Sequence, residues 1–284
     1  MSDVTPTLRP VAVSPPPDPG RAKVITRFRL RRTKSAWRLA LPFVLLVLVW
    51  SLVRIVFQLD DSVLPSPLGV AGGMGDLVFL GILPDDIVVT LQRFLVGALL
   101  AIAIGVPIGV LLGSSRVAER MFEPFVQFIQ SIPDVALLPL LVMWFGFGNT
   151  TIQVAILYTA LVPIVLNTMV GIQTTPDLYK QAVMTLGGGR ARVLRDVYVP
   201  GALASIVVGV RLGLGYAWRI LIVGEMIVGA GGLGFLIFDA RRYFLISQVM
   251  VGMIVIGILY VIIDRLILVA IEDATVRRWG LQRL

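Results

Sequence analysis

Several ionisable side chains stand inside long apolar stretches of this 284-residue chain, and their types and spacing suit them to chemistry. Arg211, Trp218 and Glu225 are spaced by seven, so a helix places them on one face. Arg219 lies about 100° around that helix from Trp218. Asp134 stands beside a break in another apolar stretch. Charges inside apolar segments are costly, and they point to a polar cavity or to a partner.

Two interpretations of these charges stay open. In the functional one, Arg219 and Asp134 border a substrate path together with Trp218, where Arg219 favours an anion and Asp134 meets an amine. In the structural one, Arg211 and Glu225 face lipid head groups or neighbouring helices, and Asp134 pairs with Arg219. The candidate pathway set is Asp134, Asn167, Trp218, Arg219 and Glu225.

The composition excludes several kinds of catalysis. The chain has no cysteine and no histidine, so it has no disulfides, no Cys or His metal sites and no Ser–His or Cys–His catalytic pairs. No flanking pattern supports Asp134 and Glu225 as an aspartyl pair, and nothing matches the phosphate-binding loop Gly-x4-Gly-Lys-Ser/Thr. We expect no catalytic residue, no metal site and no bound cofactor. If ATP energises the protein, ATP and Mg bind to another chain.

The composition is that of a membrane protein. The chain is 57% hydrophobic and 15% charged, with a mean hydropathy of +0.91, whereas soluble domains are about 45–50% apolar and about 25% charged. The net charge of +8 does not indicate nucleic acid, because eight of the 25 Lys and Arg lie between Arg21 and Arg38, directly before the first apolar stretch. That placement fits orientation in a membrane and contact with anionic lipid.

We expect an all-α integral membrane protein with one domain and an N-terminal extension. Residues 1–34 are rich in proline and then in basic residues, which predicts a disordered N-terminus, and no signal peptide is visible. Residues 35–284 are expected to form the transmembrane domain. Its six spans are predicted at about 37–57, 87–113, 124–147, 151–172, 201–228 and 243–271.

Small residues and prolines inside the spans predict how the helices pack. Two stripes of small residues let neighbouring helices approach closely in lipid. They are Gly97, Ala101, Gly105, Gly109 and Gly113, and then Ser205, Gly209 and Gly213. The third span is interrupted at residues 131–134 and again at Pro139. It is either a kinked, packed helix or a discontinuous helix that lines a cavity.

The segments between the spans place the chain in the membrane. We expect a turn-rich outer segment around residues 60–67, a short basic loop at 114–120, and an outer turn with a short helix at 229–243. Six spans put both termini on one side, where most of the basic residues also lie. By the positive-inside rule that side is the cytoplasm.

Residues 176–200, which we call the coupling segment, form the longest polar interruption between apolar blocks. They predict a short amphipathic helix with Asp177 at its N-terminus, a turn at Gly187–Gly189 and a basic stretch beginning at Arg190. Pro200 suits the first turn of the next helix. The segment is either a docking element between spans or a solvated loop that touches nothing.

The coupling segment resembles the loop of ABC importer membrane subunits, which reads Glu-Ala-Ala, three residues, Gly, and a longer gap ending in Leu-Pro. Ala182, Gly187 and Pro200 fall on its fixed points, whereas Gln181 replaces the usual acidic residue and Val183 the second alanine. In that family the loop inserts into a groove on the ATPase subunit. The resemblance implies an ATPase-coupling set of Tyr179, Gln181, Ala182, Leu186, Gly187, Gly188, Arg190 and Pro200.

Further segments between about residues 62 and 279 resemble the permease of the nitrate, sulfonate and taurine importer group. They include Thr90-Leu91-Gln92-Arg93, Glu225-Met226 and Gly232-Leu233-Gly234. The resemblance implies a non-catalytic permease of the bacterial inner membrane that moves a small, anionic solute of the sulfonate, taurine or nitrate kind. It also implies a periplasmic or lipid-anchored binding protein, a second permease copy and two ATPase subunits. The alternative is an ATP-independent channel or an ion-coupled carrier, because six spans allow either.

Overall fold

The computed structural model describes residues 36–265, and every regular element in that range is a helix. The predicted N-terminal tail and the end of the last predicted span lie outside the described residues. The helices are α1 (Ala36–Val56), α2 (Pro67–Phe79), α3 (Ile82–Ser114), α4 (Arg116–Gln130), α5 (Asp134–Phe145), α6 (Asn149–Gln173), α7 (Asp177–Thr185), α8 (Arg190–Val193), the π-helical turn η3 (Leu194–Tyr198), α9 (Val199–Val228), α10 (Leu233–Arg242) and α11 (Ile246–Ile263).

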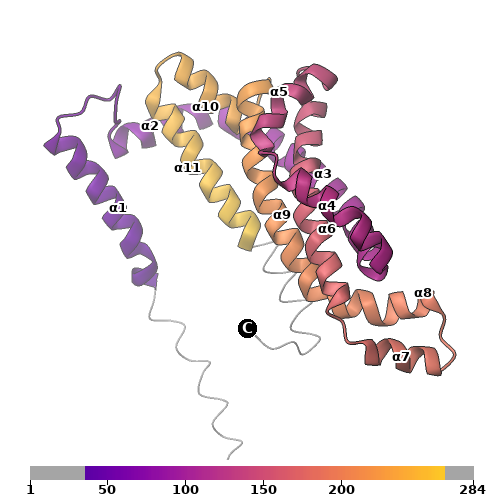
Figure 1. Ribbon diagram of the computed structural model, residues 1–284. Helices are drawn as coiled ribbons and strands as arrows, with labels where there is room; N and C mark the ends of the chain where they lie inside the picture. Colours follow the sequence, from indigo (N-terminus) through magenta and orange to yellow (C-terminus); the bar gives the residue numbers. More distant parts are fainter. Residues whose placement is uncertain (1–35, 266–284) are drawn as a thin grey trace, which may run out of the picture. The chain divides into compact units, whose positions relative to one another are not determined.

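The chain divides into two compact units at Val56, so that α1 is the described part of the first unit and all other helices belong to the second. In the second unit α3, α6 and α9 pack side by side as the central bundle (Figure 1). Helix α6 occupies the middle, and Ile152, Ile156 and Ile164 on it are fully buried. The core of the unit therefore lies along α6.

The two small-residue stripes explain why these three helices lie so close, as the sequence predicts. A Cβ added at Gly109 on α3 would lie 2.5 Å from the Cβ of Thr168 on α6. On the other side of α6, a Cβ added at Gly213 would lie 2.8 Å from the carbonyl oxygen of Ala160. Only glycine permits such an approach, because real Cβ atoms essentially never come within 3.0 Å of another heavy atom of this kind.

The third apolar region is bent by 92° between α4 and α5, which confirms the predicted interruption at residues 131–134. The prediction of a second interruption at Pro139 was wrong, since α5 continues through that residue. A proline already has a helical φ and removes one hydrogen bond, which a packed helix tolerates. The predicted basic loop at 114–120 was also wrong, because α4 begins at Arg116, where the Ser115 hydroxyl accepts a hydrogen bond from the Ala118 amide at 3.4 Å.

The segments that were predicted to lie outside the membrane contain one predicted helix and one that the sequence did not suggest. Helix α10 confirms the short helix predicted after residue 229 and packs against α9 and α11. Helix α2 follows the predicted turn-rich segment, at residues for which no helix was predicted. The Ser66 hydroxyl caps it by accepting from the Gly69 amide at 3.0 Å, and Pro67 occupies its first turn.

The coupling segment folds as a helix, a turn and a second helix. Helix α7 begins at Asp177 as predicted, and Gly187 follows it with φ +81°, a conformation that glycine adopts freely. Pro200 lies in the first turn of α9, as predicted, and α8 and η3 lead into α9 without a break from Arg190. In η3 the Val199 amide bonds to the Leu194 carbonyl, five residues back, just before the proline that lacks a donor.

Among the described residues, four helical stretches are long and apolar enough to cross a membrane, namely α3, α6, the run from Arg190 to Val228, and α11. The bent α4–α5 pair would make a fifth. The apolar part of α1, Leu41–Val56, is shorter than a full span. The fold is therefore an all-helical membrane bundle with four or five spans, and the count of six stays a prediction.

Candidate functional site

Glu225 lies at the centre of a group that we call the buried polar cluster, formed by Thr90, Arg93 and Glu225. Its side chain is fully buried. It accepts hydrogen bonds from the Thr90 hydroxyl at 3.0 Å, from the Arg93 guanidinium at 2.9 Å and from the Gly234 amide at 3.0 Å. A buried carboxylate needs such a full set of donors, because it has lost its water. The cluster joins α3, α9 and the start of α10.

The same cluster fixes the chain between α9 and α10. Arg93 also donates to the Asn149 side chain at 2.8 Å and to the Gly231 carbonyl at 2.6 Å. The Gly232 amide donates to Asp86 at 2.7 Å, and Gly232 has φ +102°. A side chain at Gly232 would collide with the Glu225 carboxylate. Arg93 was missed as a site residue, although a charge in an apolar stretch is a sufficient signal to find it.

Trp218 and Arg211, on the same face of α9 as Glu225, also have partners within the chain. Trp218 is buried, with its ring edge-on to Phe94 at 5.2 Å and tilted against Tyr260 at 6.1 Å. Arg211 makes a two-pronged ion pair with Asp264 on the segment after α11, at 3.1 and 3.0 Å. Glu225 and Trp218 thus pack inside one chain, and the geometry does not favour a solute path past them.

A cavity of about 310 Å³, which we call the bend cavity, opens beside the break between α4 and α5. Asp134 reaches it from the first turn of α5, and Thr159 of α6 lines it with a buried hydroxyl that has no hydrogen-bond partner among the described residues. Tyr158 also lines it, and its hydroxyl donates to the Ile129 carbonyl at 3.1 Å. The remaining lining residues are Ile129, Gln130, Val162, Pro163 and Tyr216.

Arg219 is exposed and lies close to the bend cavity without pairing with Asp134. Its guanidinium lies 5.7 Å from the ring centre of Tyr216, which lines the cavity. Among the described residues no ion pair joins Arg219 to Asp134, so the structural interpretation of that pair finds no support. Asn167 donates to the Pro163 carbonyl of its own helix at 2.8 Å and does not line the cavity. Of the five candidates, only Asp134 lines the bend cavity, and Arg219 lies over the ring of a lining residue, Tyr216.

The residues of the ATPase-coupling set lie in the part of the second unit that holds α7 and α8, at the opposite end of α9 from α10 (Figure 1). No residue of α7 is buried. Tyr179 is 59% exposed and Leu186 is 84% exposed, although both carry large apolar surfaces. Gln181 and Ala182 are exposed as well. An amphipathic helix with uncovered apolar residues is suited to a partner.

An all-helical membrane bundle that carries an exposed helix and turn at one end is the architecture of a transporter's membrane subunit. The chain belongs to the family described as binding-protein-dependent transport system inner membrane component, whose model matches residues 105–280. As a member, it is a non-enzymatic permease of an ABC importer, a multi-pass protein of the inner membrane that works with an ABC ATPase and a substrate-binding protein.

Three named relatives resemble the chain over most of its length. The taurine transport system permease protein TauC of Escherichia coli is 30% identical over 249 residues, covering 82% of this chain and 90% of that protein. The putative aliphatic sulfonates transport permease protein SsuC of Bacillus subtilis is 29% identical, covering 80% and 83%. The nitrate import permease protein NrtB of Synechocystis is 31% identical, covering 81% and 86%.

A solved structure shares the fold. A chain of the MetNI methionine ABC transporter in an inward-facing conformation aligns with a TM-score of 0.53 at 21% identity. The alignment covers 72% of this chain and 98% of that chain. At this identity the likeness concerns the fold alone.

Proposed function

We propose that this permease moves a small anionic solute of the sulfonate, taurine or nitrate kind, which a periplasmic or lipid-anchored binding protein delivers. The bend cavity is the observation that carries the proposal, because it is a polar space beside a discontinuous helix in a membrane bundle. The similarity to taurine, sulfonate and nitrate permeases supports this class of solute.

The charges near the bend cavity suit a solute with an acidic group. The exposed guanidinium of Arg219 attracts the anion, and the Tyr216 ring below it holds the guanidinium near the cavity. Asp134 attracts an amine if the solute has one. The free hydroxyl of Thr159 adds a donor inside the cavity. A taurine-like solute, with an amine and a sulfonate, uses both charges.

Transport is driven by a separate ATPase that binds α7. The support is the exposed apolar surface of α7 and the match of the coupling segment to the importer loop. ATP and Mg bind to the ATPase, and this chain needs no cofactor of its own. Closure of two ATPase subunits pulls on α7 in each of two permease copies. The continuous helix from Arg190 to Val228 carries that movement into the bundle.

The topology that fits this arrangement has six spans and both termini in the cytoplasm. The six are α1, α3, the α4–α5 pair, α6, the run containing α9, and α11. Helix α7 then lies between the fourth and fifth spans, on the same side as the termini. Arg190, Arg192 and Arg195 next to it support a cytoplasmic position.

The ligand retained by the co-expressed binding protein tests the class of solute. The binding protein is purified without added solute, and mass spectrometry identifies what it carries. We expect a sulfonate or another small anion, taurine included. A cationic or uncharged ligand would contradict the proposal, since Arg219 would then repel or ignore the cargo.

A further inference from the structure

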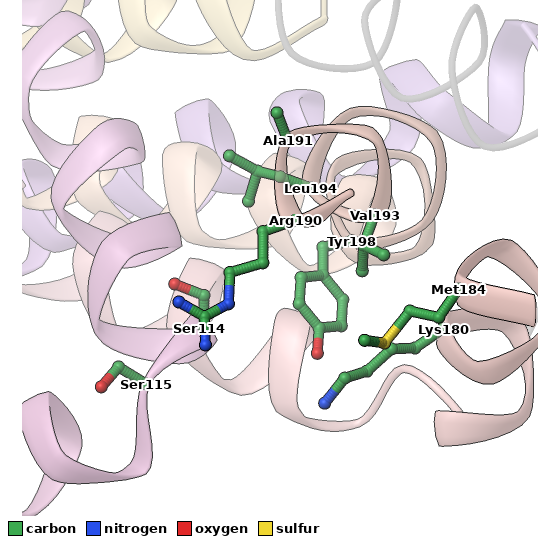
Figure 2. Close-up of a pocket in the computed structure, with 9 residues that line it drawn as sticks. All are labelled: Ser114, Ser115, Lys180, Met184, Arg190, Ala191, Val193, Leu194 and Tyr198. Atoms are coloured by element: carbon green, nitrogen blue, oxygen red, sulfur yellow. The ribbon is translucent and has the colours of Figure 1, made fainter. Parts of the chain in front are cut away.

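A second cavity, of about 600 Å³, lies where α7 and α8 meet the junction of α3 and α4, and we call it the basic cavity (Figure 2). It opens at the end of the unit that carries the coupling segment, far along α9 from the buried polar cluster. Its lining residues are Ser114, Ser115, Lys180, Met184, Arg190, Ala191, Val193, Leu194 and Tyr198.

The polar side chains of this cavity are two cations and three hydroxyl groups. Lys180 and Arg190 supply two positive charges, and none of the nine lining residues is acidic. In Figure 2 the Arg190 side chain points toward Ser114, and the ends of Lys180 and Tyr198 point toward one another. Two cations that share a concave space raise its potential and attract an anion.

In the part of the chain whose side chains are described, one of these donors is already used, because the Ser114 hydroxyl donates to the Leu111 carbonyl at 2.9 Å. There, neither Lys180 nor Arg190 has an ion-pair partner, whereas their neighbour Arg192 pairs with Asp196 at 3.7 Å. The Ser115 hydroxyl accepts from the Ala118 amide, which leaves its own proton to donate. The cavity therefore presents an ammonium, a guanidinium and hydroxyl donors together, a combination that matches the oxygens of a phosphate.

We propose that the basic cavity binds a phosphate group, carried by an anionic phospholipid or by a free phosphate anion. The cavity is larger than a phosphate ion alone, and apolar side chains of Met184, Val193 and Leu194 line the rest of it. That surplus space suits the ester-linked part of a lipid head group. Basic pockets between membrane helices are known to bind such head groups. A free phosphate satisfies the same donors.

A phosphate bound here joins three parts of the subunit. Lys180 belongs to α7, Ser114 and Ser115 to the junction of α3 and α4, and Arg190 to the helix that continues as α9. On α7, Ala182 lies about 160° around the helix from Lys180 and stays free, whereas Arg190 belongs both to the cavity and to the coupling set. The bound phosphate stiffens α7 against the bundle. It therefore raises the efficiency with which ATPase movement reaches the spans, a consequence that rests on the proposed function.

Binding is tested first on the purified permease without its ATPase. One arm measures retention of phosphatidylglycerol by native mass spectrometry, and the other measures equilibrium binding of radiolabelled inorganic phosphate. The test variant is Lys180→Gln with Arg190→Gln. The control, Arg192→Gln with Arg195→Gln, removes the same charge from exposed positions that do not line the cavity. Thermal unfolding is measured for both, and Lys180→Arg serves as a variant that keeps the charge.

We expect the test variant to lose binding by about tenfold or more, while the control and Lys180→Arg retain it. Phosphatidylglycerol retention without phosphate binding identifies the lipid as the source, and the reverse identifies the free anion. Absence of both from the parent protein overturns the site, as does an equal loss in the control.

The assembled transporter then tests the consequence. ATP hydrolysis and uptake are compared in nanodiscs or vesicles with and without the anion found in the first experiment. Fewer solutes moved per ATP in its absence support the stiffening role. If the anion binds the permease but the number of solutes moved per ATP stays the same without it, the stiffening role is overturned and the phosphate site stands. A subunit that never couples to ATP refutes the proposed function instead.

Discussion

Arg93 on α3 and Glu225 on α9 form a buried ion pair, with 2.9 Å between the guanidinium nitrogen and the carboxylate oxygen. The side chains are 9% and 0% exposed. Together with Thr90 and the Gly234 amide, the pair fixes the ends of three helices to one another. These residues, which resemble a family motif, therefore hold the bundle together.

Removing one partner of this pair should destabilise the subunit strongly. Arg93→Met leaves the Glu225 carboxylate buried without its cation, and we expect a loss of about 3–5 kcal/mol. The double variant Arg93→Met with Glu225→Met removes both charges and should be more stable than the single variant. Thermal unfolding in detergent measures both. A single variant as stable as the parent would show that the pair contributes nothing.

Close packing of α3 on α6 predicts a second stability effect. Gly109→Leu places a side chain against Thr168 and the Val165 carbonyl, and we expect it to cost about 1–3 kcal/mol or to prevent folding. Gly257→Leu on α11 is the control, because a Cβ there meets nothing within 4 Å. Size-exclusion profiles and unfolding temperatures compare the two. Equal elution profiles and unfolding temperatures for the two variants would contradict the idea that Gly109 is needed for close packing of α3 on α6.

Charge removal at Arg219 tests the anion path. We expect Arg219→Gln to lower uptake of an anionic solute about tenfold, because it removes the cation next to the bend cavity. The control Arg242→Gln removes a cation that lies over the Phe238 ring, 5.9 Å from its centre, on α10. Uptake is measured in vesicles with the ATPase and the binding protein. Unchanged uptake by Arg219→Gln would exclude Arg219 from the path.

The absence of cysteine makes the docking surface simple to map. A single cysteine introduced as Ala182→Cys on α7 should crosslink to the ATPase subunit within a short reach. The control Tyr243→Cys should not crosslink to the ATPase. Tyr243 is exposed and directly follows α10, at the opposite end of α9 from α7. Gel electrophoresis after crosslinking in native membranes separates the products. Crosslinking from Tyr243→Cys but not from Ala182→Cys would place the ATPase at the end of the bundle that carries α10 and would contradict docking on α7.

The sequence predicted features that depend on local spacing. The glycine stripe around Gly109, the turn at Gly187 and the interruption before Asp134 each follow from a backbone property of a few residues. Pro139 misled the prediction because packing can offset the lost hydrogen bond and the steric clash of one proline inside a helix. The start of α4 at Arg116 was missed because charges at a helix end resemble a loop.

Pairing across the fold was not predictable from one chain. Glu225 and Trp218 stood out as charged or polar groups in an apolar stretch, but their spacing does not say that Arg93 and Phe94 lie opposite. The partner of Arg211, Asp264, is 53 residues away in sequence. The bend cavity likewise needs α4, α5, α6 and α9 in place before Asp134 acquires its neighbours.

The measurement that tests the central claim most directly is uptake of labelled solute by vesicles that contain the purified permease, with or without its ATPase. The binding protein is present outside and ATP inside in every sample. We predict uptake only with the ATPase, and none when ATP is replaced by a non-hydrolysable analogue. Solute accumulation or exchange by the permease alone would contradict a subunit that moves its cargo through a separate motor.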